Sequence, residues 1–541
     1  MKQALLATLV CATLSALGAP IQVKDLRTES TTNPVGVSST PRLSWQLGSE
    51  ERGAFQGAYE ILAATSPEKL EKEKADLWAS KKQKGTGRLL VQWQGKPLKK
   101  GQKVHWKVRV WNQKDEAGEW SETATFVVGD QMQLTKPGRI SGFESSSGKI
   151  NELYSESIAN LKKRLAAFSK SDAAALGDGS DVHRSARAFL YHFDSAPHLT
   201  EWLRLMDAGL TKDSFFPTHP GSKKAAPISS DAGVLVTHPL WWMSGDSQLT
   251  RSRWETYEGH IIAREEQDTL LKGSKWGGLT DSEGVSAEFI DLCYLGFSCR
   301  LILELALPAV QPQKAIRFQV YASRIRKSFE RQFVNEDGSL KTKSQTGHVL
   351  ALRSAVLNPK QKAKVLGDLI TLVEKNGSEV GPIGAHFLPG VLSLTGNQDL
   401  ALKTLTNLTD KEQKTFVETG IAEWLMTFVA GIDTIVPGFN QAIIAPRIPS
   451  DDSVTWVKAH HNSPSGTISV HWEKLPQSAL KANVVIPAGA LSRVILPIGE
   501  GQDVTEGGQK ISDAVGVEVV EKKNGKVTLI TQSGKYSFLI K

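Results

Sequence analysis

Three aspartates around one predicted helix start are the first residues whose types and spacing could carry chemistry. Asp178 and Asp181 lie at the head of the segment LGDGSDVHRSARAFLYHFD, residues 176–194, and Asp172 stands four residues before it. A carboxyl group can donate a proton to a leaving group or, once ionised, activate water. At a helix start it can equally be a solvated group that accepts backbone N–H bonds. The residues just before the segment, 173–175, are alanines and can do neither kind of chemistry.

The same segment resembles, position for position, the stretch L-G-W-T-G-D-A-Q-V-F-A-R-T-A-A-Y-N-F-D of bacterial inverting α-L-rhamnosidases. In that family an Arg-Glu-Arg triplet precedes the Leu-Gly, and its Glu is the general acid; the alanines 173–175 stand there in this chain. An inverting glycosidase needs two carboxyl groups about 6.5–9.5 Å apart, one as acid and one as base. The resemblance implies that Asp181 binds a sugar hydroxyl. Asp172 and Asp178 are then the candidate replacement acids.

A second landmark, SSDAGVLVTHPLWWMSGDSQL at residues 229–249, resembles the family's W-G-D-A region with the proline, aromatic residue and Gly-Asp that follow it. The resemblance implies that Asp231 faces a saccharide-binding cavity and that Trp242 contributes a sugar-binding aromatic ring. The pair Gly245-Asp246 is typical of a turn that ends a helix.

Two further landmarks lack their functional side chains. Where the family reads Y-G-D-W-L, with a sugar-binding Asp and Trp, residues 276–280 read WGGLT, which leaves Trp276 as the candidate stacking residue. The family's catalytic base lies in a T-x-W-E-x-W stretch, but residues 402–420 contain no Trp and have no room for that loop. Glu418 could approach the cavity mouth, or it could be an exposed acid near a helix end.

We therefore predict a carbohydrate-active protein related to α-L-rhamnosidases, with impaired or lost glycoside hydrolysis. Two alternatives stay open: an active glycoside hydrolase on plant or algal polysaccharide with a relocated acid/base pair, and a non-catalytic saccharide-binding protein. Whether the chain is an enzyme is open for the same reason. The expected ligand is a rhamnose-containing or related glycan. We expect no cofactor and no metal, because the 12 histidines show no metal-ligand spacing.

Helices must position these residues. Apolar residues recur three and four apart through most of residues 150–436, in runs of ten to twenty residues separated by Gly- and Pro-containing loops. This pattern favours stacked helical hairpins, and the family resemblance implies an (α/α)6 six-hairpin barrel. Cys293 and Cys299, six residues apart on one predicted helix, should be buried core residues rather than a disulfide.

Strands are predicted on both sides of the barrel. Residues 20–130 contain short alternating runs such as KVHWKVRVWN and six tryptophans, which is typical of a sandwich core. This part resembles the fibronectin-III-like β-sandwich that opens many α-L-rhamnosidases. Residues 131–149 have a linker composition. Residues 437–541 return to β-branched runs bounded by Gly and Pro, and PSGTISVHW and IPAG within them resemble the family's closing β-sandwich.

The N-terminal residues and the overall composition indicate where the protein is expected to be located and which partners are not favoured. Residues 1–19 combine Lys2, an apolar run and small residues, which is typical of a signal peptide, so we expect export to the periplasm or the medium. No other apolar run is long enough to predict a membrane span. The 541 residues carry a net charge of +8 with basic and acidic residues interspersed, which does not favour nucleic-acid binding.

Overall fold

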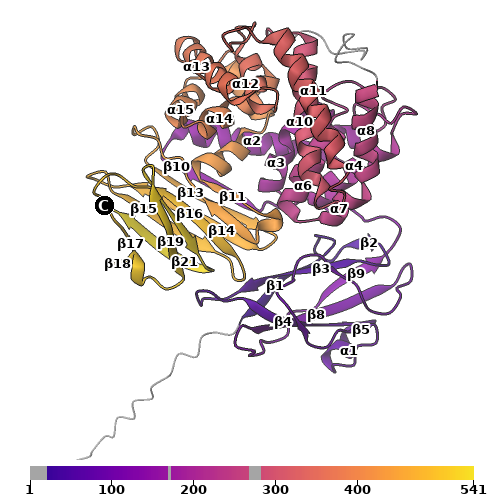
Figure 1. Ribbon diagram of the computed structural model, residues 1–541. Coiled ribbons are helices and arrows are strands. Elements are labelled where there is room, and N and C mark those ends of the chain that lie inside the picture. Colours follow the sequence, from indigo (N-terminus) through magenta and orange to yellow (C-terminus); the bar gives the residue numbers. More distant parts are fainter. Residues whose placement is uncertain (1–20, 169–171, 267–281) are drawn as a thin grey trace, which may run out of the picture.

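The computed structural model describes residues 21–168, 172–266 and 282–541, which form three domains in the predicted order. A helical barrel lies above two β-sandwiches, the N-terminal one and the C-terminal one (Figure 1). This confirms the predicted multidomain α+β architecture. The predicted signal peptide, residues 1–19, lies outside the described residues.

The N-terminal sandwich is built from two sheets, with strand orders β1-β3-β7 and β2-β9-β8-β4-β5 and with β6 paired to β4. Its strands are β1 (Gln22–Thr28), β2 (Val35–Val37), β3 (Arg42–Gly48), β4 (Gln56–Ala64), β5 (Trp78–Ala79), β6 (Gln83–Lys84), β7 (Val91–Gln92), β8 (Lys103–Asn112) and β9 (Ala124–Val128), and α1 (Pro67–Glu71) follows β4. In β8, Val104, Trp106, Val108 and Val110 are completely buried, as their alternation predicts.

The barrel alternates outer and inner helices. The outer helices are α2 (Gly148–Ala167), α4 (Ala196–Ala208), α8 (Trp254–Glu266), α11 (Ala315–Phe333), α13 (Pro359–Asn376), α15 (Gln398–Thr406) and α16 (Asp410–Glu418). The inner helices are α3 (Gly179–His192), α5 (Ala232–Leu235) with α6 (Thr237–Ser244), α10 (Ala287–Ala306), α12 (Gln345–Arg353), α14 (Pro382–Leu394) and α17 (Ile421–Trp424) with the π-helical turn η2 (Leu425–Val429). The turn η1 (Ala173–Leu176) precedes α3, and α7 (Ser247–Ser252) follows α6.

Each inner helix contacts the next, from α3 through α5/α6, α10, α12 and α14 to α17, and α17 packs against α3, so the ring closes. The sequence explains the layering. The inner helix α10 is apolar almost all round and buries both Cys293 and Cys299 as unpaired core residues. The outer helix α11 is amphipathic and buries only one stripe.

The C-terminal sandwich pairs a sheet of order β10-β13-β14-β15-β21-β17-β18 with one of order β11-β12-β16-β20-β19. Its strands are β10 (Ser141–Ser145), β11 (Ile432–Thr434), β12 (Gln441–Ile444), β13 (Trp456–Ser463), β14 (Gly466–Lys474), β15 (Leu480–Ile486), β16 (Leu491–Pro497), β17 (Val504–Glu506), β18 (Gln509–Lys510), β19 (Val517–Lys523), β20 (Lys526–Thr531) and β21 (Gly534–Ile540), with the turns η3 (Pro437–Phe439) and η4 (Ile511–Asp513). Strand β10 comes from the segment expected to be a linker, so the chain enters this sheet before it enters the barrel.

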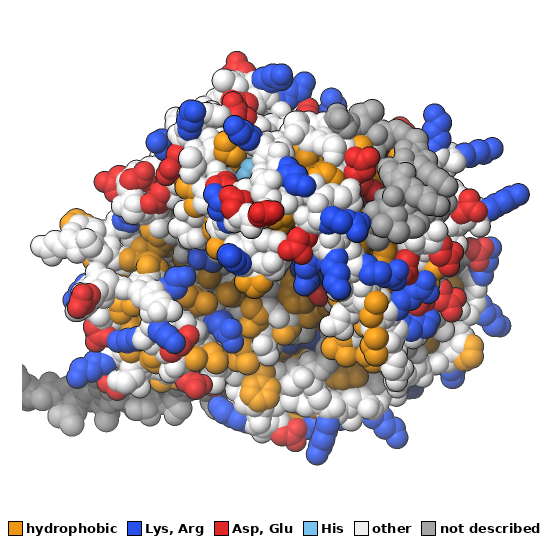
Figure 2. Space-filling view, turned by 45° about the horizontal axis from the view of Figure 1, so that its top comes forward, with side chains coloured by type: hydrophobic (Ala, Val, Ile, Leu, Met, Phe, Trp, Pro, Cys, Tyr) orange, Lys and Arg blue, Asp and Glu red, His pale blue; other side chains and the backbone are white. Residues whose placement is uncertain are grey.

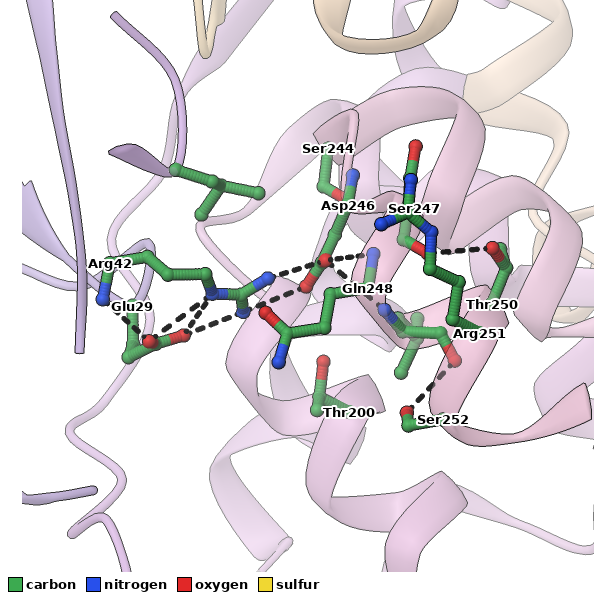
Figure 3. A network of polar contacts seen from close by, with 12 residues as sticks. Glu29, Arg42, Thr200, Ser244, Asp246, Ser247, Gln248, Thr250, Arg251 and Ser252 are labelled. Atoms are coloured by element: carbon green, nitrogen blue, oxygen red, sulfur yellow. Dashed lines mark hydrogen bonds and ion pairs between the residues drawn. The ribbon is translucent and has the colours of Figure 1, made fainter. Parts of the chain in front are cut away.

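The barrel and the C-terminal sandwich share one continuous hydrophobic core, whereas the N-terminal sandwich has a separate one. Polar contacts therefore carry much of the attachment of the N-terminal domain. Arg42 of β3 donates to Glu29 at 2.6 Å and to both oxygens of Asp246 at 2.6 and 2.9 Å (Figure 3). Asp246 also caps α7 by accepting the backbone N–H groups of Gln248 and Leu249.

The surface carries interspersed acidic and basic side chains, and the face in Figure 2 has a hollow in which hydrophobic side chains are exposed. Among the described residues, every helix is too short or too polar to span a lipid bilayer.

We expect Arg42→Met to loosen the N-terminal domain, because the Arg42 and Asp246 side chains are only 15% and 16% exposed and the variant leaves two carboxylates without their cation. The free energy of unfolding should fall by about 1–3 kcal/mol in urea titrations followed by tryptophan fluorescence. The control is Lys100→Met, which removes an exposed ion pair with Asp130 and should cost less than about 0.5 kcal/mol. Equal losses in the two variants would show that the Arg42 contacts do not hold this interface.

Candidate functional site

The family-like acids lie where the inner helices begin. Asp178 is the N-cap of α3: it accepts the backbone N–H of Asp181 at 3.0 Å and the hydroxyls of Ser180 and Ser229 at 2.7 and 3.3 Å. Asp181, in the first turn, binds Arg184 at 2.7 Å with about half of its side chain exposed. Both carboxylates therefore already have partners within the protein, and Asp178 has a structural task.

Asp172 and the alanines next to it form the start of this region. The Asp172 side chain is exposed, and residues 173–176 form the single turn η1. Glu418 is the last residue of α16, half exposed and 4.0 Å from Lys414. Glu418 nevertheless lies within electrostatic range of Arg164, as do Asp178 and Asp181. Trp276 lies outside the described residues.

Asp231 is fully buried at the start of α5, inside an ionic cluster. Its carboxylate lies 3.0 Å from His260 Nε2 and 3.3 Å from Arg264, and Arg264 also donates to Asp291 at 2.6 Å. Burial alone would raise the pKa of Asp231, but Arg264 and His260 outweigh it and hold the pKa below its ordinary value. The cluster ties the outer helix α8 to the inner helices α5 and α10.

Glu283 is a carboxylate that sequence reasoning missed at this end of the barrel. It accepts the hydroxyl of Thr346 at 2.6 Å and the backbone N–H groups of Gly381, Ile383 and Gly384 at 3.0, 2.9 and 3.1 Å. It thus caps α14 from another part of the chain, where the helix dipole favours an anion. No local signal marks it, because its partners are about 60 to 100 residues away in sequence.

An aromatic layer crosses the barrel beyond these helix starts. The His183 ring packs edge-on against Tyr294 and His386 at centroid distances of 5.4 and 5.6 Å, and His386 packs against Phe387 at 4.4 Å. Burial, followed by Arg184, lowers the pKa of His386 to about 3. Burial likewise lowers the pKa of His183 well below its ordinary value, so both rings are neutral at physiological pH.

A cavity of about 290 Å³, lined in part by His183 and His386 of this layer, extends toward the carboxyl ends of the inner helices. Leu394, the last residue of α14, is exposed, whereas the other lining residues are buried or half-buried, so the cavity opens at that end. Trp242 of α6 lines the cavity, as do Trp424 and Phe428. Of the predicted saccharide-binding residues within the described chain, Trp242 is therefore the one that reaches this cavity.

Charged groups from four inner helices and β11 also line the cavity: Arg184, Arg187, Arg300, Arg353, Glu423 and Asp433. Arg187 lies 3.3 Å from Glu423 and donates to Asp433 at 2.9 Å. Burial raises the pKa of Glu423 above its ordinary value, although Arg187 opposes the shift. The arrangement can hold polar and ionic ligand groups beside aromatic faces. Among the described residues, no group of His, Cys, Asp and Glu side chains could hold a metal ion.

The closed ring of helix pairs, flanked by two sandwiches, defines a six-hairpin glycosidase-type architecture. Residues 138–424 match the family model of the bacterial alpha-L-rhamnosidase 6 hairpin glycosidase domain. Residues 23–130 match the Rha78A-like N-terminal immunoglobulin domain, and residues 431–510 match the bacterial alpha-L-rhamnosidase C-terminal domain. The chain belongs to the bacterial α-L-rhamnosidase family.

Two individual α-L-rhamnosidases are similar in sequence to this chain. The chain is 35% identical over 411 residues to an α-L-rhamnosidase of Alteromonas sp., which covers 66% of this chain and 44% of that protein. It is 26% identical over 397 residues to one of Streptomyces avermitilis, covering 65% of this chain and 38% of that protein. The chain thus matches less than half of the length of either relative.

Solved structures confirm the fold. The Streptomyces avermitilis α-L-rhamnosidase complexed with L-rhamnose superposes with a TM-score of 0.86 at 13% identity, covering 96% of this chain and 100% of that chain. The α-L-rhamnosidase of Dictyoglumus thermophilum gives 0.85 at 13% identity, with 96% and 99% covered.

We expect Asp231→Ala to act on stability, because it leaves the fully buried Arg264 with one carboxylate fewer. The free energy of unfolding should fall by about 3–5 kcal/mol in urea titrations. The control Asp368→Ala, which removes a surface pair with Lys364, should cost less than about 0.5 kcal/mol. A variant that keeps its stability but loses saccharide binding would instead make Asp231 a ligand residue.

The pH dependence of stability should report the buried His386. The unfolded chain takes up a proton on this ring below about pH 6.5, whereas the folded protein does so only near pH 3, so unfolding is favoured as the pH falls between these values. One such ring contributes a slope of about 1.4 kcal/mol per pH unit. In urea titrations between pH 4 and 8, the free energy of unfolding of His386→Gln should depend less on pH than that of wild type below pH 6. Above pH 7 the two proteins should show the same pH dependence. An unchanged slope would contradict the buried neutral state.

Proposed function

We propose that this protein is a carbohydrate-active member of its family that binds a rhamnose-containing or related glycan and hydrolyses rhamnosides weakly or not at all. The observation that carries the proposal is the alanine turn η1, which stands where the family resemblance places the general acid. The nearby acids do not supply a ready replacement, because Asp178 caps α3 and Asp181 binds Arg184.

The size of the expected defect follows from the chemistry. General acid–base groups each contribute about 10²–10⁴-fold to a rate. Alanine cannot replace such a group, and the stretch 402–420 offers no matching base. Losses of residues that act together do not simply multiply. A deficit of about 10³-fold or more is therefore the reasonable expectation.

A second candidate function is a glycoside hydrolase with a relocated acid/base pair. The observation that favours it is that Glu423 and Asp433 both line the cavity and that burial raises the pKa of Glu423, as a general acid requires. Against it, both carboxylates are bound to Arg187, which favours their ionised forms.

Export is part of the proposal and rests on the sequence of residues 1–19 alone. N-terminal sequencing of protein recovered from a bacterial host should find a mature chain that begins near residue 20. Recovery of unprocessed chain from the cytoplasm would contradict export.

The wild-type protein should turn over an aryl α-L-rhamnoside at least about 10³-fold more slowly than an active family member, measured by aryl release. Any residual rate should survive Glu374→Gln, the matched control at an exposed position of the outer helix α13. Abolition by Glu423→Gln alone, with unchanged thermal stability, would favour the relocated pair. Robust turnover that depends on Asp178 or Asp181 would contradict the proposal.

A further inference from the structure

One wall of the barrel cavity carries a cation that forms no ion pair within the described part of the chain. Arg353 is the last residue of α12 and lines the cavity beside Arg300 of α10. Its guanidinium lies 5.8 Å from the ring centroid of Phe297 and 6.0 Å from that of Phe387. The Arg300 guanidinium lies 5.1 Å from the same Phe297 ring. Two arginines thus flank one aromatic face at the cavity wall.

The other arginines of the lining differ from Arg353 in their partners. Arg184 pairs with Asp181, Arg187 with Glu423 and Asp433, and Arg300 with Glu304. Arg353 makes no ion pair or hydrogen bond to any side chain in the described part of the protein. Burial, and then the like charge of Arg300, lowers the pKa of Arg353 to about 10, although the charges of Glu423 and Glu304 oppose the shift without pairing with Arg353.

The free-energy cost of holding the Arg353 guanidinium without an ion pair indicates which kind of ligand would bind there. A desolvated cation without a counterion destabilises the protein that holds it, and an oxyanion entering the cavity would remove that penalty. The guanidinium fork matches the two oxygens of a carboxylate in a bidentate pair. The buried Nε of Arg300 also lacks a hydrogen-bond partner among the described residues, so the same wall has a second donor to offer.

The rest of the lining fits a sugar ring. Trp242 stacks on His238 with an interplanar angle of 12°, and Trp424 stacks on Phe428 at 27°. Aromatic faces take up the apolar face of a pyranose, while carboxylates such as Glu423 and Asp433 accept its hydroxyl protons. A volume of about 290 Å³ lies at the lower end of the range for small-ligand sites, enough for one sugar unit.

We propose that the cavity at the carboxyl ends of the inner helices binds an acidic sugar unit of a glycan, with its carboxylate held by Arg353 and assisted by Arg300. The proposal rests on the proposed saccharide binding and names the chemical class of the ligand. A hexuronic acid fits the site better than a neutral sugar. His183 and His386 of the aromatic layer line the cavity on the side of the helix starts, where Arg184, also in the lining, binds Asp181.

The test uses the full chain and isothermal titration with three probes: methyl glucuronide, the matching neutral methyl glucoside and methyl rhamnoside. We expect methyl glucuronide to bind at least about tenfold more tightly than methyl glucoside, and its affinity to fall with salt. Arg353→Met should lose about 10- to 100-fold in affinity for methyl glucuronide while its binding of the neutral probes stays unchanged. The control Arg331→Met, on the exposed face of α11, should bind like wild type.

A second measurement guards against a folding defect. Because the arginine has no acidic partner, Arg353→Met should keep or raise the thermal midpoint of the unliganded protein. Arg353→Lys should retain the charge but bind the glucuronide more weakly than wild type, because it lacks the fork. A large drop in the midpoint of Arg353→Met would overturn the assignment, since it would give the side chain a structural task.

The outcomes separate the two proposals. Equal binding of methyl glucuronide and methyl glucoside, or full glucuronide affinity in Arg353→Met, would overturn the acidic-sugar assignment and leave saccharide binding intact. Preference for a sulfated methyl glucoside over the glucuronide would overturn the carboxylate assignment. Failure of every saccharide probe to bind would overturn the proposed function as well.

Discussion

The barrel depends on a guanidinium that has no contact with water. Arg264, on the outer helix α8, is fully buried and binds Asp231 and Asp291 at the starts of two neighbouring inner helices. Such a charge is tolerated only while its partners stay in place, so it fixes the positions of three helices at once. The ring of inner helices can close, and enclose a cavity, because these helix starts are held in register. A residue that resembles a sugar ligand in the family pattern thus has a sufficient structural reason to be there.

Other residues near the family-like segments also have partners within the protein. Asp178 caps α3, and Asp246 caps α7 while it binds Arg42 of the N-terminal domain. Arg187 joins α3 to Glu423 and to β11 of the C-terminal sandwich. Each of these contacts stabilises the fold without any reaction taking place. A scaffold of this kind can therefore tolerate an alanine turn at η1, because no helix depends on an acid there.

Sequence reasoning succeeded where a local pattern sets the structure. Alternation in β8, the apolar character of α10 and the turn at Gly245, which adopts a positive φ of 79°, were all readable from neighbouring residues. It failed where the outcome depends on which distant segments meet. Strand β10 pairs with β13, more than 300 residues later, so its sequence alone looked like a linker. Arg353 and Glu423 likewise give no signal of a shared cavity, because they come from helices that only ring closure brings together.

The two ends of the barrel can therefore serve different purposes. The rings of His183 and His386 lie between the helix starts and the cavity, and burial keeps both neutral at physiological pH. At the helix starts the carboxylates of Asp178, Asp231 and Glu283 are occupied by caps and ion pairs. At the cavity end Arg353 forms no ion pair with any acidic side chain among the described residues. Binding energy is most available where the protein leaves a polar group without a partner, and this is the physical basis for proposing a ligand at the cavity.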